Sequence, residues 1–142
     1  MNSSTSLHRQ IHPSWVDNNE VSSQAFDVSI TSQAFTPTAK DDNKLSVSNG
    51  EKINPKNSYD AHIAQGLKSA GVMSVLGNEC DSIQLSYEED NDPYEGHSFI
   101  DYSKCTSKTE VRAKAKVLKA FAIKRGWTHK PDSPQETELK TA

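Results

Sequence analysis

The most apolar run in the chain, residues 72–76, is five residues long and lies between Gly71 and Gly77. A short apolar run between two glycines favours a buried β-strand. It is far shorter than the roughly 18 apolar residues that a membrane-spanning helix needs. Leu, Ile, Val and Phe together number only 26 of 142 residues. The chain therefore has to build a modest core from short elements such as this one.

Other segments have the same short, β-like character. Residues 7–11 form a strand candidate that ends at Pro13, because proline has no N–H to donate to a neighbouring strand. Residues 45–47, 83–87 and 97–102 are further candidates, and residues 83–87 alternate apolar and polar side chains as a half-buried strand does. We therefore expect five or six short strands.

The clearest helix is predicted over residues 108–125. Ser107 and Glu110 form a capping box at its start, and apolar residues then recur at helical spacing. Gly126 stands where a helix commonly ends in the left-handed conformation.

A second helix is expected to begin after Ser58 as its N-cap and to end at Gly71, with Pro55 blocking any earlier start. Two helices and several short strands predict an α+β fold. In the expected arrangement, a small mixed or mostly antiparallel sheet carries both helices on one face.

The chain length fits a single domain. We expect a disordered N-terminus over residues 1–6, a single α+β domain over residues 7–127 and a disordered tail over residues 128–142. No apolar run follows Met1, so no secretory signal is indicated. The two cysteines are isolated from each other, which favours reduced thiols. These features predict a cytoplasmic protein without membrane association.

The tetrapeptide Ser-Gln-Ala-Phe occurs twice, at residues 23–26 and 32–35. The longer segments that contain them, residues 21–26 and 30–35, each open with a β-branched residue and end with an aromatic one. Two copies are too few for a repeat architecture. A hairpin fits this pattern, and so does a local duplication in which only one copy occupies the original place.

Candidate ligand-binding residues lie in the first strand candidate and in the second copy of the tetrapeptide. Arg9 is a potential anion ligand, and His12 is a potential acid or base beside it. On a straight strand the two would face opposite ways, but a bend at Pro13 would bring them together. Thr31 and Ser32 are candidate hydroxyl ligands for a substrate or phosphate. Ordinary structural roles at a half-exposed sheet edge fit the same residues.

Glu95 and His97 form a second candidate pair. Residues two apart on a strand point to the same side, so a carboxylate and an imidazole here could exchange protons with a substrate. Alternatively, the histidine only caps the strand. The histidines and cysteines show no zinc or calcium spacing, so we expect no metal site. The sequence leaves the identity of any cofactor open.

Charge is segregated along the second half of the chain. Residues 81–95 contain six acidic residues and no Lys or Arg, whereas residues 104–125 contain eight basic residues and one acidic residue. This arrangement suits a protein partner. Arg112, Lys116 and Lys119 share one side of the predicted helix and could contact nucleic acid, although no nucleic-acid-binding motif accompanies them. A solvated lysine face is the ordinary alternative.

Four segments together resemble a group of small bacterial proteins: Leu-His-Arg-Gln-Ile-His-Pro at 7–13, Ser-Gln-Ala-Phe-Thr-Pro at 32–37, Leu-Ser-Val at 45–47 and Arg-Gly-Trp at 125–127. The resemblance covers most of residues 7–127 and implies a bacterial, cytoplasmic, single-domain protein. It implies no activity. The pattern has one Ser-Gln-Ala-Phe segment, so the extra copy is a departure that leaves its register open.

A smaller set of residues resembles ADP-ribosyltransferase-type folds. These folds place an arginine or histidine on a first strand, a Ser or Thr on a second and a glutamate on a later one, where they bind and activate NAD. Arg9 or His12, Ser32 and Glu95 follow that order. The motifs are short, and the third element is not a full match. The resemblance implies an enzyme that acts on a nucleotide-like substrate.

Two classes of function follow. The first is a small interaction or accessory module that binds a protein partner. The second is an enzyme or ligand-binding protein for a nucleotide-like substrate, with Arg9 binding the anion, His12 or His97 transferring a proton, and Ser32 orienting the substrate. Convergence of these four residues in one pocket would favour the second class. An exposed apolar patch elsewhere would favour the first.

Overall fold

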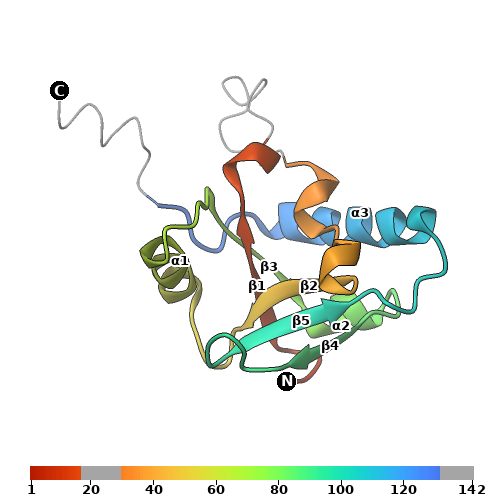
Figure 1. Cartoon of the computed structure of the whole chain (residues 1–142), viewed down its shortest axis with the longest axis horizontal. Coiled ribbons are helices and arrows are strands. Elements are labelled where there is room, and N and C mark those ends of the chain that lie inside the picture. The colour runs from red at the N-terminus through yellow and green to blue at the C-terminus, as the bar shows by residue number, and fades with distance from the viewer. Residues whose placement is uncertain (17–29, 132–142) are drawn as a thin grey trace.

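The computed structural model describes residues 1–16 and 30–131 and contains one five-stranded sheet (Figure 1). The strands are β1 (Ser6–Ile11), β2 (Lys44–Asn49), β3 (Gly71–Leu76), β4 (Ser86–Glu89) and β5 (His97–Asp101). Their order across the sheet is β3-β1-β2-β5-β4, and each neighbouring pair is antiparallel. Together with the helices, this sheet confirms the predicted α+β fold class.

Helix α3 covers Lys108–Arg125, as its capping box and apolar spacing predict. The hydroxyl of its N-cap, Ser107, accepts a hydrogen bond of 3.1 Å from the backbone N–H of Glu110. Gly126 follows the last turn with a φ of 85°, a value that favours glycine. Local signals are therefore sufficient to place both ends of this helix.

Helix α1 covers Pro55–Ala64 and begins earlier than predicted. The side chain of its N-cap, Asn54, accepts a hydrogen bond of 2.8 Å from the backbone of Asn57. The expectation that Pro55 blocks this helix is wrong, because the first helical position needs no N–H donor. A third helix, α2 (Gly77–Asp81), is short and is not predicted by the pattern. No helix in the described residues has the length and apolar character needed to cross a membrane.

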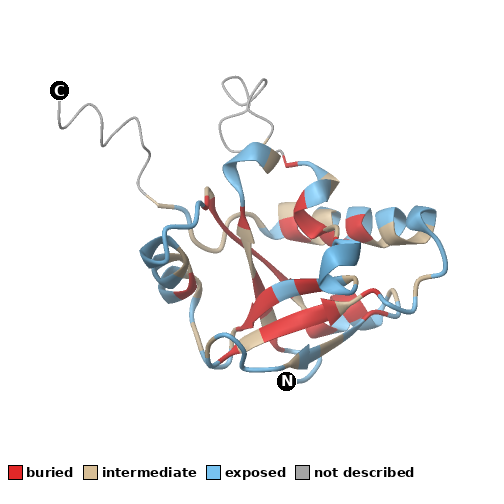
Figure 2. Cartoon of the chain, viewed as in Figure 1, coloured by how far each residue is buried: buried red, intermediate tan, exposed pale blue. Residues whose placement is uncertain are grey.

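One face of the sheet carries the apolar core. Along β1, Leu7 and Ile11 are fully buried on this face. Core side chains from the neighbouring strands are all at most 3% exposed: Leu45, Val47, Met73, Val75 and Ile100. Helix α3 packs here through buried residues on its inner side, and Figure 2 shows burial concentrated there and along the central strands.

The opposite face of the sheet is covered by α1. His8 and Gln10 point to this face because they alternate with Leu7 and Ile11 along β1. The side-chain amide of Gln10 donates a hydrogen bond of 2.8 Å to the hydroxyl of Ser58 in α1. Helices α1 and α3 thus lie on opposite faces, in contrast to the expected placement on one face. The side of α1 that meets the sheet is polar and has no apolar stripe to add to the core.

The fourth strand begins later than predicted. The pattern favours a strand over residues 83–87, whereas β4 begins at Ser86 and ends at Glu89. Gln84 has a φ of 62°, which is outside the extended conformation, so the strand cannot include it. Ile83 packs against the core from the turn that precedes the strand.

The second Ser-Gln-Ala-Phe copy is not a strand but a 3-10 helix, η3 (Ser32–Phe35). Ala34 and Phe35 are fully buried in the core. The backbone carbonyls of this segment also have partners: Arg9 Nε donates to Ala34 O at 2.8 Å, and the Tyr102 hydroxyl donates to Phe35 O at 2.6 Å. The first copy of the tetrapeptide lies outside the described residues.

At both ends, residues outside the predicted domain boundaries of 7 and 127 form hydrogen bonds with the domain. Thr5 is 3% exposed, and its carbonyl accepts a hydrogen bond from the first residue of α2, whereas the sequence predicts disorder there. After α3, Thr128 N donates to Val72 O at 2.9 Å, and Val72 N donates to His129 O at 2.8 Å. These bonds add the start of the expected tail to the outer edge of β3. Residues 132–142 lie outside the described residues.

Candidate functional site

The face of the sheet under α1 is polar. His8 and Gln10 of β1, Ser46 and Ser48 of β2 and His97 of β5 share it through strand alternation and pairing. Strands β1 and β2 pair at only two positions, whereas β1 and β3 pair at six. Beyond His8, therefore, β1 separates from β2, and the backbone of Ser46 has no partner strand on that side.

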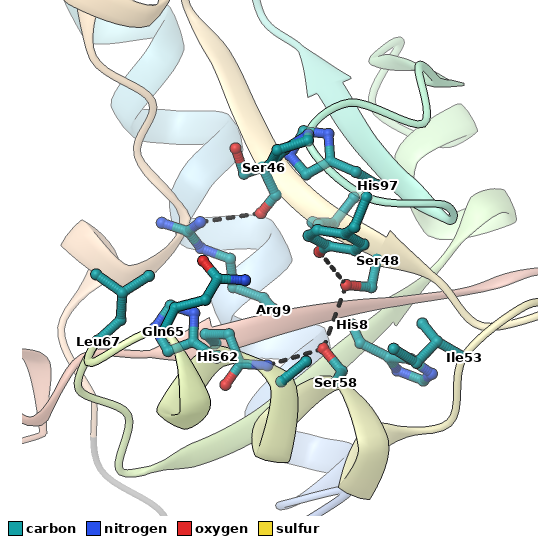
Figure 3. Close-up of a pocket in the computed structure, with 15 residues that line it drawn as sticks. His8, Arg9, Ser46, Ser48, Ile53, Ser58, His62, Gln65, Leu67 and His97 are labelled. Atoms are coloured by element: carbon teal, nitrogen blue, oxygen red, sulfur yellow. Dashed lines mark hydrogen bonds between the residues drawn. The ribbon is translucent and has the colours of Figure 1, made fainter.

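Arg9 fills the gap between β1 and β2 (Figure 3). Its Nε donates to Ala34 O at 2.8 Å, and its Nη1 donates to Ser46 O at 2.9 Å. Within the described residues, Nη2 has no acceptor. The guanidinium carbon lies 5.2 Å from the centroid of the Trp15 ring, a cation–π geometry. Burial lowers the pKa of Arg9 to about 10, so the side chain stays charged at neutral pH.

Two pockets meet at Arg9. The first, here called the inner pocket, has a volume of about 250 Å³ and lies between α1 and strands β1, β2 and β5. The second, the outer pocket, has a volume of about 370 Å³ and lies beside η1 (Pro13–Trp15) and residues 66–68. The residues that line both pockets are Arg9, Gln10, His62 and Leu67. Pockets of this size suit a small metabolite.

Helix α1 forms the roof of the inner pocket with one side of its surface. Ser58, Ala61, His62 and Gln65 line the pocket, and their spacing of three and four residues places them on the same side of the helix. Figure 3 shows Ser58, His62 and Gln65 facing the sheet residues across this space. Because these side chains are small or polar, α1 leaves a hydrogen-bonding space above the sheet.

A chain of hydrogen bonds crosses the inner pocket. Gln10 Nε2 donates to Ser58 Oγ at 2.8 Å, Ser58 Oγ lies 3.2 Å from Ser48 Oγ, and Ser48 Oγ lies 2.7 Å from the Tyr94 hydroxyl (Figure 3). We call these four residues the hydroxyl relay. Gln10 Oε1 is buried without a hydrogen-bond partner in the described residues. Reversing the amide would only exchange which end of Gln10 is unpartnered.

His8 is held in one tautomer by a second chain of hydroxyls. Thr128 Oγ1 donates to Val72 O at 3.0 Å, so the 2.9 Å bond between Ser74 and Thr128 uses the Ser74 proton. Ser74 Oγ then accepts from His8 Nδ1 at 2.7 Å. His8 Nε2 is therefore an unprotonated acceptor. Burial lowers the pKa of His8 to about 4, so the ring is neutral at pH 7.

His97 and His62 are also oriented by hydrogen bonds. His97 Nδ1 lies 2.5 Å from Asp90 Oδ1, which places the proton on Nδ1 and leaves Nε2 as the available nitrogen. His62 Nε2 donates to the backbone carbonyl of Lys68 at 3.2 Å, which leaves Nδ1 as an acceptor. Burial is the main cause that lowers the pKa of His62, and the positive charge of Arg9 adds to the effect.

The outer pocket presents donors. His12 Nδ1 accepts a hydrogen bond of 3.0 Å from Ser14 N, so the proton of the neutral ring is on Nε2. The centroids of the His12 and Trp15 rings lie 5.8 Å apart, and the Arg9 guanidinium lies over the Trp15 ring. Lys68 is exposed at the same pocket. This pocket therefore combines the donors of Arg9, His12 and Lys68.

The pockets contrast with the charge of the whole chain. The chain has a net charge of −3 and 19 acidic residues. None of the described residues that line either pocket is Asp or Glu, and four of the chain's five histidines line them. No group of three His, Cys, Asp or Glu side chains within residues 1–16 and 30–131 is arranged to hold a metal ion. The histidines thus act separately, as hydrogen-bonding groups.

The structure brings together some of the predicted site residues and separates others. Arg9 lines both pockets, His97 lines the inner one and His12 the outer one. Ser32 and its neighbour Thr31 line neither pocket, since they lie at the start of η3. The Glu95 side chain is 83% exposed and lies 3.9 Å from Lys52 Nζ, away from both pockets. The acid/base partner of His97 in the structure is thus Asp90, and the expected roles of the other residues stay predictions.

Several site residues were not predicted from the sequence: His8, Ser48, Ser58, His62 and Tyr94. One available signal is that His8 and Gln10 are polar residues two apart on a strand, and so are Ser46 and Ser48. Residues with this spacing share one face of the sheet. Ser58 and Tyr94 have no comparable signal, because they reach the pocket from α1 and from a loop.

The basic side of α3 is separate from this site. Arg112 and Lys116 are exposed and Lys119 is half-buried, on the helix that covers the other face of the sheet. In the described part of the chain, the acidic residues of the segment 81–95 form no ion pair with this helix, and Glu89 and Glu95 approach Lys52 instead. Nucleic-acid binding by α3 stays a prediction.

Comparisons with known proteins find no matching family model, no matching curated protein and no matching solved structure. The resemblances to small bacterial proteins and to ADP-ribosyltransferase-type folds therefore stay predictions from short motifs. For the second resemblance, Arg9, Ser32 and Glu95 do not meet in either pocket. The functional argument depends on the geometry of the two pockets.

Proposed function

We propose that this protein binds a small organic anion where the inner and outer pockets meet, with Arg9 as the main ligand. The observation that carries the proposal is the position of Arg9. It is half-buried, lines both pockets and has an Nη2 without an acceptor in the described residues. A partly desolvated guanidinium with open donors suits a carboxylate or phosphate, because these groups accept paired N–H bonds.

The surroundings of Arg9 support the same ligand. No acidic side chain among the described residues lines either pocket, so no described carboxylate directly faces an entering anion. His12 and Lys68 add donors on the outer side. Two bonds to backbone carbonyls hold the guanidinium in place, so little side-chain entropy is lost when a ligand binds.

A protein-partner role, the first expectation from the sequence, has less support. The exposed large apolar side chains among the described residues are Met1, Ile63, Leu67 and Val117. Single exposed apolar side chains are ordinary on a protein surface. The feature that favours a partner is the basic side of α3, which makes binding of an acidic protein a second proposal.

Nuclear magnetic resonance can test anion binding with an internal control. The chain has two tryptophans. Trp15 lines the outer pocket, whereas Trp127 packs against the core and beside Gly71. On titration with inorganic phosphate at constant ionic strength, we expect the indole N–H signal of Trp15 to shift and saturate, and that of Trp127 to stay in place. Equal small drifts of both signals would contradict the proposal.

Variants then identify the ligands. Arg9→Gln is expected to abolish saturable binding, but it also removes the bonds to Ala34 and Ser46. Lys68→Ala avoids this problem, because Lys68 is exposed and uses only its backbone carbonyl in the fold. It should raise the dissociation constant for phosphate about fivefold, the effect of losing one exposed charge contact. The matched control is Lys116→Ala on α3, which should leave the constant unchanged.

A further inference from the structure

The two pockets differ in hydrogen-bond character. In the outer pocket, the groups that have no acceptor among the described residues are donors: Arg9 Nη2, His12 Nε2–H and the Lys68 ammonium. Three separate donors, two of them on cationic side chains, suit the terminal oxygens of a phosphate monoester better than the two oxygens of a carboxylate. The outer pocket is therefore the expected position of the charged end of a ligand.

In the inner pocket, two imidazole nitrogens without a protein donor in the described residues are acceptors, on His8 and on His62, which lines the outer pocket as well. Ser74 holds His8 with Nε2 unprotonated, and the Lys68 carbonyl leaves Nδ1 of the neutral His62 ring as the acceptor. His97 donates from Nδ1 to Asp90, so its Nε2 is the nitrogen without a protein partner in the described residues. Acceptors of this kind repel an anion and favour a group that donates a proton. The charged end of a ligand is therefore better accommodated in the outer pocket, where His12 and Lys68 join Arg9.

The hydroxyl relay supplies both donors and acceptors to the same pocket. With Gln10 Nε2 donating to Ser58, the relay can run with Ser58 donating to Ser48 and Ser48 to Tyr94, and in that arrangement the Tyr94 hydroxyl is a free donor. If the Gln10 amide turns over, Ser58 donates to it and the Tyr94 proton points back to Ser48, which leaves Tyr94 as an acceptor. A group that can donate or accept as required, namely an alcohol, matches this relay in both states.

From this separation of donors and acceptors we infer that the ligand is a phosphate monoester of a small polyhydroxylated compound, such as a pentose phosphate. Its phosphate lies in the outer pocket at Arg9, His12 and Lys68. Its hydroxyl groups lie in the inner pocket, within reach of the histidine acceptors and the relay. The inference rests on the proposed anion site and adds the class and the orientation of the ligand.

Titration of the full chain with ribose 5-phosphate, inorganic phosphate and ribose tests this inference. We expect ribose 5-phosphate to bind at least about tenfold more tightly than inorganic phosphate, the gain from one or two further hydrogen bonds. Ribose alone should not bind measurably, since it lacks the charged group. The Trp15 indole signal and isothermal calorimetry report the same binding event independently.

Tyr94→Phe tests the orientation, because it removes only the hydroxyl at the end of the relay. It should weaken ribose 5-phosphate about fivefold, as expected for one lost hydrogen bond, and leave inorganic phosphate unchanged. Tyr59→Phe is the matched control, since Tyr59 lies on α1 against His129 and lines neither pocket. It should change neither constant.

The possible failures are distinguishable. If inorganic phosphate binds and ribose 5-phosphate binds no more tightly, the inferred ligand class is wrong and the anion site stands. If Tyr94→Phe weakens both ligands equally, the orientation is wrong. If neither anion shifts the Trp15 signal in a saturable way, or if both bind but Lys68→Ala leaves their dissociation constants unchanged, the anion site itself is refuted.

Discussion

The buried ring of His8 predicts that folding is sensitive to mild acid. Burial lowers the pKa of His8 from 6.5 to about 4 in the folded protein. Between these values the unfolded chain binds a proton that the folded protein does not. The contribution of His8 to the free energy of unfolding is therefore fully present above pH 6.5. It is lost as the pH falls toward the pKa of His8 in the folded protein.

The size of the effect follows from the two pKa values. Over the whole interval the free energy of unfolding should fall by about 3 kcal/mol, and between pH 7 and pH 5 by about 2 kcal/mol. The physical reason is that protonation would place a second N–H on a ring that is 5% exposed. The hydrogen bond from His8 Nδ1 to Ser74 would not compensate for the cost of burying the charged ring.

Urea unfolding at pH 7, 6 and 5 measures this loss in the parent and in His8→Asn. Asparagine does not titrate, and its amide can still donate to Ser74 in place of Nδ1. The variant should be less stable at pH 7 but should lose about 2 kcal/mol less than the parent on acidification to pH 5. Other titrating groups, including His62, are common to both proteins and cancel in the comparison. Equal losses in the two proteins would refute a buried, neutral His8.

Two further predictions concern stability. Leu118→Ala should lower the free energy of unfolding by about 3 kcal/mol, because Leu118 is fully buried, whereas Val117→Ala, at 36% exposure on the same helix, should cost less than about 1 kcal/mol; similar losses in urea unfolding would contradict the packing of α3. Glu79→Gln should cost about 2 kcal/mol, because the 8% exposed Glu79 accepts a 2.6 Å bond from Arg125. Asp60→Asn removes an exposed ion pair on α1 and should change the same free energy by less than about 0.5 kcal/mol; a comparable loss in both variants would contradict the Glu79 prediction.

Elements whose signals are local could be predicted from the sequence. Helix α3 is an example, since Ser107, the apolar spacing and Gly126 all lie within the helix or beside it. Strands β1, β2, β3 and β5 were also predicted in nearly their observed positions. The sequence pattern places the start of helix α1 too late, because proline disrupts the interior of a helix but is accepted in its first turn.

The site depends on contacts that no local pattern contains. Arg9 meets Ala34 across 25 positions, and Ser48 meets Tyr94 across 46. Ser32 was expected in the site because it is a hydroxyl residue, but the segment that contains it contributes its Ala34 carbonyl to Arg9 and its apolar side chains to the core.

The sequence by itself determined the helix and strand periods, the caps and the small supply of apolar residues. These properties act between residues that are neighbours along the chain. Only the tertiary structure decided that α1 covers the polar face of the sheet, that β1 separates from β2 beside Arg9, and that four histidines line the resulting pockets. Which residues meet there depends on how the strands are ordered and how the helices pack across the whole fold, and neither is encoded in the spacing of any single segment.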